Sequence, residues 1–178
     1  MSVGTKVLLI TLPILIILFL SAILSKVLYK KRKQIKFNKV FDVINKALNT
    51  KIMNMYYKNN DYYDLFIETQ YSKYFIKIIL EGKNKVLKID SNYNYYFIDR
   101  KNNAKNINDM VKISSNEFNY IDVNKRVNKI IILYPDVLQK LFYKSQVEAR
   151  FIYLDFEIQG THILNFSEVK NFFDNSEL

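Results

Sequence analysis

Apolar residues form one unbroken run near the start of the chain, and later they recur on shorter periods. The run covers residues 7–24, and its sixteen apolar residues are interrupted only by Thr11 and Ser21. Eighteen helical residues span roughly 27 Å, close to the hydrocarbon thickness of a bilayer. The pattern therefore predicts a transmembrane helix in an anchor over residues 1–34, followed by one domain over residues 35–178.

Positive charge follows this run at once, and it predicts the orientation of the anchor. Only Lys6 and the amino terminus precede the run, whereas a cleaved signal peptide carries its charge before a short apolar core. A lipoprotein signal is excluded because the chain has no Cys. An uncleaved, single-pass anchor in the cell membrane is expected, with the N-terminus outside and the domain cytoplasmic. The basic residues expected to flank the membrane and contact its lipids are Lys26, Lys30, Lys31, Arg32 and Lys33.

The next segments change period from helix to strand. Apolar residues at spacings of three and four predict an amphipathic helix over residues 35–58. Four runs rich in Tyr, Phe and Ile predict strands, with a hairpin loop over residues 81–85 between the second and the third. These strands are expected at residues 62–69, 74–80, 86–90 and 95–99. Residues 101–113 are polar and rich in Asn, which predicts a loop or a poorly ordered insertion.

The last third of the domain alternates between strands and helices. A helix over residues 117–127 is expected after Ser115, and the apolar run 129–134 predicts a strand buried on both faces. Pro135 suits the first turn of a helix over residues 137–144. Strands at 150–154 and 162–166 and a final helix capped by Ser167 complete the pattern. It predicts an α/β fold, with α+β as the variant, in which helices flank one mixed sheet.

Composition and charge exclude some functions but do not identify one. The net charge is +10, but residues 1–39 hold eight basic residues and no acid, which leaves a balance of only +2 for the rest. Residues 73–130 hold twelve basic and six acidic residues, so nucleic acid is kept as a candidate partner of this basic middle segment. With no Cys and one His, thiol chemistry and a two-His metal site within one chain are excluded.

One arrangement of residues points to chemistry. Asp64 lies in the first predicted strand, after a helix, and Phe75, Ile76 and Lys77 lie in the second. This order resembles the core of restriction-endonuclease-like folds, and in particular the nuclease-related (NERD) domain, which has an acid in one strand and Glu-x-Lys in the next. The resemblance extends over residues 38–174 as an order of elements.

The resemblance implies a site with named roles. Asp64 and Lys77 would be the catalytic residues, and Asp64 would hold a divalent metal such as Mg²⁺ that activates water against a phosphodiester. Their side chains would then have to converge on one face of the sheet. Phe75, however, stands where the second carboxylate of the family belongs, and Mg²⁺ is seldom held by one carboxylate without help from substrate phosphates.

We therefore expect a membrane-anchored, non-catalytic interaction module of degenerate nuclease-like fold, with no cofactor and with a protein partner at the membrane. The alternative is a tethered metal-dependent nuclease or nucleic-acid-binding protein, with Asp64 and Lys77 as its site. A third interpretation is a subunit of a larger membrane assembly.

Overall fold

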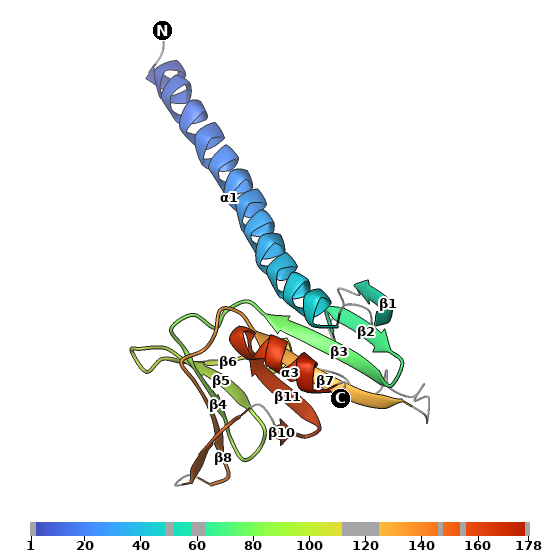
Figure 1. Ribbon diagram of the computed structural model, residues 1–178. Helices are drawn as coiled ribbons and strands as arrows, with labels where there is room; N and C mark the ends of the chain where they lie inside the picture. The colour runs from blue at the N-terminus through green and yellow to red at the C-terminus, as the bar shows by residue number, and fades with distance from the viewer. Residues whose placement is uncertain are drawn as a thin grey trace. The chain divides into compact units, whose positions relative to one another are not determined.

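The computed structural model describes residues 3–48, 52–57, 63–111, 125–145, 148–153 and 156–176. By its internal contacts the chain divides into two compact units, Met1–Asn38 and Lys39–Leu178. Helix α1 (Val3–Leu48) forms the described part of the first unit and ends in the second (Figure 1). Between Leu15 and Leu28 its large apolar side chains are 44–66% exposed.

The predicted transmembrane anchor is wrong. In the part of the chain that the structure describes, no helix offers a stretch long and apolar enough to cross a membrane.

The single-pass localisation in the cell membrane, with the N-terminus outside and a cytoplasmic domain, is corrected together with the anchor. The five residues expected to flank the membrane lie instead along the exposed surface of α1; they are Lys26, Lys30, Lys31, Arg32 and Lys33.

The second unit begins with the last turns of α1. Val40, Ile44 and Leu48 recur every four residues and are almost completely buried, as expected for the apolar stripe of a core helix. The helix predicted over residues 35–58 nevertheless ends at Leu48, and the described part of its remainder is strand β1 (Ile52–Tyr57). This strand pairs with its neighbour in the sheet, so tertiary pairing overrides the helical spacing of the segment.

Sheet A, the larger of two mixed sheets, has the strand order β1-β2-β3-β7-β11-β10. Strands β3, β7 and β11 run parallel, whereas β1, β2 and β10 pair antiparallel with their neighbours. Their bounds are β2 (Leu65–Thr69), β3 (Ser72–Ile79), β7 (Arg126–Leu133), β10 (Glu157–Ile158) and β11 (Thr161–Asn165). The strand predicted at 129–134 is confirmed: Ile130–Leu133 of β7 are buried on both faces.

Sheet B has the strand order β6-β5-β4-β8-β9, with β4 and β8 parallel and the other pairs antiparallel. Its bounds are β4 (Val86–Ile89), β5 (Tyr95–Ile98), β6 (Ala104–Asn106), β8 (Gln139–Tyr143) and β9 (Ala149–Phe151). Residues 81–85 are not a hairpin loop, because β3 and β4 lie in different sheets. Residues 101–113, predicted as a loop, contain β6 and the short helix α2 (Asn108–Val111).

The two sheets share a core, and a helix packs on the other face of sheet A. Side chains of β4 and β5, among them Leu87 and Phe97, are buried in one cluster with Ile131 and Ile163 of β7 and β11. On the opposite face of β3, Tyr74 packs edge-to-face against Phe173 of helix α3 (Val169–Ser176). Figure 1 shows α3 beside β7 and β11.

Two predictions for the C-terminal third need correction. The helix predicted over 137–144 is wrong: residues 139–143 form strand β8, whose backbone pairs with β4 and whose Lys140 side chain is buried. The final helix exists, and Val169, Phe172 and Phe173 are buried as expected, but Ser167 is not its cap. Asn165 begins the turn η3 (Phe166–Glu168) in a capping box with Glu168. The helix predicted over 117–127 lies mostly outside the described residues, and its last two residues belong to β7.

These elements make a mixed α/β protein. The single mixed sheet that the sequence predicted is replaced by two, because residues between β3 and β7 and after β7 build sheet B instead of extending sheet A.

Candidate functional site

The two sequence-predicted site residues lie side by side. The antiparallel register of β2 and β3 places Phe66 opposite Phe75. Asp64, two residues before Phe66, and Lys77, two residues after Phe75, therefore face each other on the same side of sheet A. Lys77 Nζ lies 3.8 Å from Asp64 Oδ1, and the side chains are only 13% and 15% exposed. The convergence that the nuclease resemblance requires is therefore present.

The backbone of β3 also forms hydrogen bonds with Asp64. The Asp64 amide donates to the carbonyl of Ile76 at 2.8 Å, and Asp64 Oδ2 accepts a hydrogen bond from the amide of Ile78 at 2.7 Å. The carboxylate thus continues the β2–β3 pairing one step beyond the first residue of β2. A hydrogen bond from a buried amide to a charged acceptor is among the stronger ones in proteins. The Asp64 carboxylate therefore stabilises the pairing of β2 with β3.

Phe75, which stands at the position of the missing carboxylate, lies in an aromatic cluster. Its ring contacts Tyr63 and Phe66 edge-to-face, with centroids 5.2 Å and 5.0 Å apart, and Val127 packs against the three. Phe75 is 9% exposed. The surroundings of this position are apolar and aromatic, which suits ring packing and would penalise a charged group.

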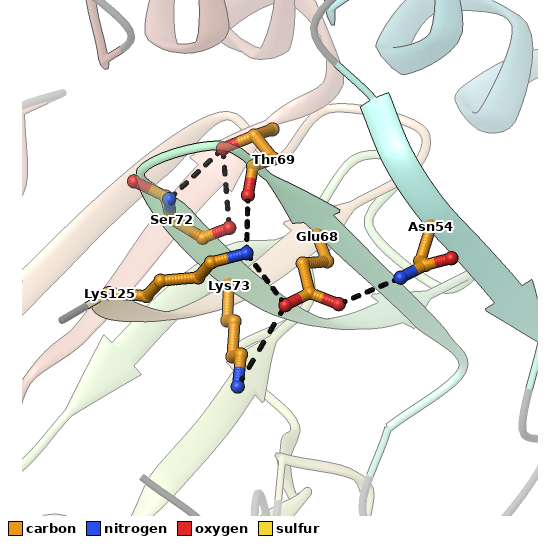
Figure 2. A network of polar contacts seen from close by, with 6 residues as sticks. All are labelled: Asn54, Glu68, Thr69, Ser72, Lys73 and Lys125. Atoms are coloured by element: carbon orange, nitrogen blue, oxygen red, sulfur yellow. Dashed lines mark hydrogen bonds and ion pairs between the residues drawn. The ribbon is translucent and has the colours of Figure 1, made fainter. Parts of the chain in front are cut away.

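A second polar group lies beyond the cluster on the same face, around Glu68 (Figure 2). Glu68 Oε1 accepts a hydrogen bond from Lys125 Nζ at 2.9 Å and lies 3.9 Å from Lys73 Nζ, while Oε2 accepts from Asn54 at 3.0 Å. Lys125 also donates to the carbonyl of Thr69 at 3.1 Å. Four segments are tied together here: β1, β2, β3 and the residue that precedes β7.

The electrostatics of Glu68 follow from these contacts. Hydrogen bonds from Lys125 and from Asn54 hold the pKa of the Glu68 carboxyl below its usual value, against the opposing effect of burial, and the charge of Lys73 adds to the lowering. The group is ionised at neutral pH and forms the centre of a partly buried ion-pair network.

We call this surface the β2–β3 face; it consists of Asp64, Phe66, Glu68, Lys73, Phe75 and Lys77. Its two carboxylates are separated by the Phe66–Phe75 pair, and lysines contact each of them. Among the residues described, no three His, Cys, Asp or Glu side chains gather closely enough to hold a metal ion. Asp64 is the group on this face that the resemblance named as a ligand.

The single histidine lies elsewhere in sheet A. His162 Nε2 is 3.0 Å from Glu157 Oε1, and the ring packs against Phe172. Burial lowers the pKa of His162, Glu157 opposes that shift, and Arg126 adds to it. This arrangement is that of a core histidine between β11 and α3.

The nuclease resemblance required Asp64 and Lys77 to converge, and they do, but the sequence analysis missed the network of Glu68. Strand alternation already put Glu68 on the face of Asp64, whereas Lys125 lies 57 positions further along the chain. No local pattern could have joined those two residues, because only the parallel pairing of β3 with β7 brings them together.

Comparison with known proteins adds no relative: the chain matches no protein-family model, no curated protein and no solved structure.

Proposed function

We propose that this protein is a non-catalytic binding module whose β2–β3 face keeps the arrangement of a nuclease-like site for structural purposes. The proposal depends mainly on one observation: both carboxylate oxygens of Asp64 have partners within β3. Its Oδ2 holds the amide of Ile78 and its Oδ1 lies beside Lys77, so a metal ion bound there would compete with both contacts.

The neighbourhood of Asp64 supports the same conclusion. Mg²⁺ requires near-octahedral oxygen coordination, with the charge of one or two carboxylates and substrate phosphates nearby. Beside Asp64 stand the buried ring of Phe75 and the ammonium of Lys77. The second carboxylate of the face, Glu68, is engaged by Lys125, Lys73 and Asn54.

A metal-dependent nuclease is the alternative, and one observation favours it. Asp64 and Lys77 converge at 3.8 Å on adjacent strands, as an acid and a lysine of such a site would. In this alternative the phosphates of the substrate would supply the oxygen ligands that the chain lacks, and Lys77 would support the attacking water.

Cleavage assays on the purified chain distinguish the two functions. Single- and double-stranded DNA and RNA are incubated with Mg²⁺ or Mn²⁺, and the expected result is no metal-dependent product. Metal-dependent cutting that disappears in Asp64→Ala, with the folded structure intact, would refute the proposal and support the nuclease.

Stability measurements on the same variants test the structural role directly. Asp64→Ala should lower the free energy of unfolding by about 1–3 kcal/mol, because the Ile78 amide loses its acceptor. Asp64→Asn keeps an acceptor oxygen and should cost less. The matched control is Asp174→Ala, which removes an exposed carboxylate of α3 and should change stability by less than about 0.5 kcal/mol.

A further inference from the structure

Sheet B has one face in the core and one face directed away from it. In β4 and β5 the buried residues Leu87, Ile89, Tyr95 and Phe97 alternate with residues of intermediate exposure. Because strand side chains alternate, the second set lies on the face opposite the core. An antiparallel or mixed sheet with one solvated face usually presents polar side chains there.

This outer face of sheet B is instead rich in aromatic and apolar groups. The pairing registers place one transverse row of side chains across all five strands: Asn106, Tyr96, Lys88, Leu141 and Phe151. Tyr143 lies two residues after Leu141 on the same side, and Lys88 Nζ lies 4.2 Å from the centroid of its ring. Phe151 is 51% exposed, and the ring of Tyr153, 66% exposed, lies 6.4 Å from it.

One cation, Lys88, lies on this outer face, and the strands of sheet B contain no acid. The other basic residues of these strands, Lys105, Lys140 and Arg150, lie on the core side, because the registers pair them with Phe97, Leu87 and Phe142. Sheet B with its turns, residues 81–111 and 139–153, carries nine basic and five acidic residues.

Several of these acids are engaged within the protein. Asp90 and Asp99 accept backbone amides of their own turns, Glu81 pairs with Lys85 and Lys105, and Glu148 pairs with Arg150.

We propose that the outer face of sheet B binds single-stranded nucleic acid, with Tyr96, Tyr143 and Phe151 as stacking platforms and Lys88 as a phosphate contact. This inference rests on the proposed non-catalytic binding function and names its partner. Aromatic rings on a sheet with a cation among them, and no acid on the strands, form a surface that can bind unpaired bases without sequence preference. Paired bases hide their faces in the helical stack, so duplex is a poorer ligand for such a platform.

Fluorescence anisotropy with the full-length chain tests the proposal. The probes are labelled DNA and RNA oligonucleotides of about 16 nucleotides, with the matching duplexes for comparison, all in EDTA so that cleavage cannot contribute. Single strands should bind more tightly than duplexes. Tyr96→Ala and Phe151→Ala should each weaken binding about 5-fold or more, and Lys88→Gln should lower the slope of log affinity against log salt by about 0.7.

Tyr71→Ala is the matched control, because Tyr71 is a 64% exposed tyrosine in the turn between β2 and β3 of sheet A. It should leave affinity unchanged, and circular dichroism should show that all variants are folded. The proposal is overturned if no single strand binds at low salt, if duplexes bind equally well, or if Tyr71→Ala weakens binding as much as Tyr96→Ala. Self-association that disappears in Phe151→Ala, without oligonucleotide binding, would instead assign the face to a second copy.

These outcomes are separable from those of the proposed function. Failure to bind single strands in EDTA removes the partner and leaves the non-catalytic module standing. Metal-dependent cleavage that requires Asp64 removes the non-catalytic proposal and does not depend on Tyr96 or Phe151.

Discussion

Glu68 and Asp64 differ in how their carboxylates are used, although both lie on the β2–β3 face. Asp64 accepts a backbone amide of β3, so it stabilises one strand pair. Glu68 is held by side chains from β1, from β3 and from Lys125, the residue that precedes β7. At the scale of single residues, the stability that each carboxylate contributes depends on its hydrogen-bond and ion-pair partners, and not on the residue type alone.

Glu68→Gln should therefore show a pH-dependent loss of stability. The pKa of Glu68 is lowered in the folded protein from an ordinary value of 4.5, so its contribution is complete above that pH and is lost as the pH falls through the folded pKa. We expect the variant to lose about 1–2 kcal/mol at pH 7 and the difference from wild type to shrink below pH 4.5. Urea unfolding between pH 7 and about pH 3 measures it.

Glu148→Gln is the control for this experiment, because Glu148 pairs with Arg150 where both side chains are about half exposed. Exposed pairs contribute little, and the variant should match wild type across the range. A Glu68 variant whose deficit persists undiminished at the lowest pH would contradict the ionic origin of the effect.

Gly82 is required for space. A Cβ at this position would clash with the carbonyl oxygen of Pro135 and would lie 3.2 Å from Val137 Cγ1. Because the nearest atom belongs to the backbone, the clash cannot be relieved by a rotamer change. Gly82→Ala should cost about 2–3 kcal/mol or more.

Gly160→Ala is the comparison, since Gly160 has a φ of +67° and nothing within 4 Å of its Cβ position. Gly160→Ala should lower the free energy of unfolding by about 1 kcal/mol, the cost of holding a residue with a Cβ at a positive φ. Thermal unfolding followed by circular dichroism ranks the two variants, and equal losses would argue against the contact with Pro135.

Strand β7 is the element that the sequence predicted most clearly. Its apolar run lies between two parallel neighbours, with Ile132 paired with Ile78 on one side and Leu164 on the other. A strand in that position is covered on both faces and both edges, so every residue of its centre can be apolar.

Ile132→Ala should cost roughly 2–5 kcal/mol of unfolding free energy, because the side chain is 0% exposed. Leu138→Ala, which truncates a 56% exposed side chain just before β8, should cost less than about 0.5 kcal/mol. Urea titrations of both variants give the comparison. A loss below 0.5 kcal/mol for Ile132→Ala would mean that β7 is not the centre of the core.

Residues 35–58 and 137–144 show where local pattern misleads at the scale of elements. Both read as helix by spacing, and both contain strands, because β1 pairs with β2 and β8 pairs with β4. Helical periodicity shows which side chains could lie on one face of a helix. It contains no information about the backbone hydrogen bonds that a segment can form with a strand far away in the sequence.

For the folded domain as a whole, a buried ion pair joins the two sheets. Lys140 of β8, with its side chain 4% exposed, donates to the carbonyl of Ile163 in β11 at 2.8 Å and to the carboxylate of Glu168. Glu168 also accepts the amide of Asn165. One ammonium thus connects sheet B with the carboxyl end of a central strand of sheet A.

Lys140→Met should destabilise the folded domain by about 1–3 kcal/mol, because the carbonyl and the carboxylate lose a charged donor. Glu168 is 29% exposed, so water partly replaces the lost contact and keeps the cost below that of a fully buried pair. Lys144→Met changes an exposed lysine just after β8 and should be close to neutral. The expected result is a lower urea midpoint for the first variant only; equal midpoints would contradict the role of the bridge.

The pattern of apolar and polar residues by itself predicted strands at the positions of β3, β4, β5, β7 and β11 and the final helix, with β7 indicated by a continuous apolar run. Parallel pairing was also expected and is present, although the helix at 137–144 that contributed to this expectation is strand β8. The nuclease resemblance required Asp64 and Lys77 to share one face, and the register of β2 with β3 places them there. The helical character of the first apolar run was likewise predicted correctly, although the membrane span inferred from its length was not.

Only the tertiary structure decided the division into two sheets, the strand β8 and the partners of Glu68. Each of these depends on contacts between segments far apart in the chain, such as Lys125 with Glu68 or Lys140 with Glu168. Local sequence limits which side chains can be buried together on one element. Which strands then pair is settled by the balance between loop-closure entropy and the packing and hydrogen bonds gained, and those gains belong to the assembled fold.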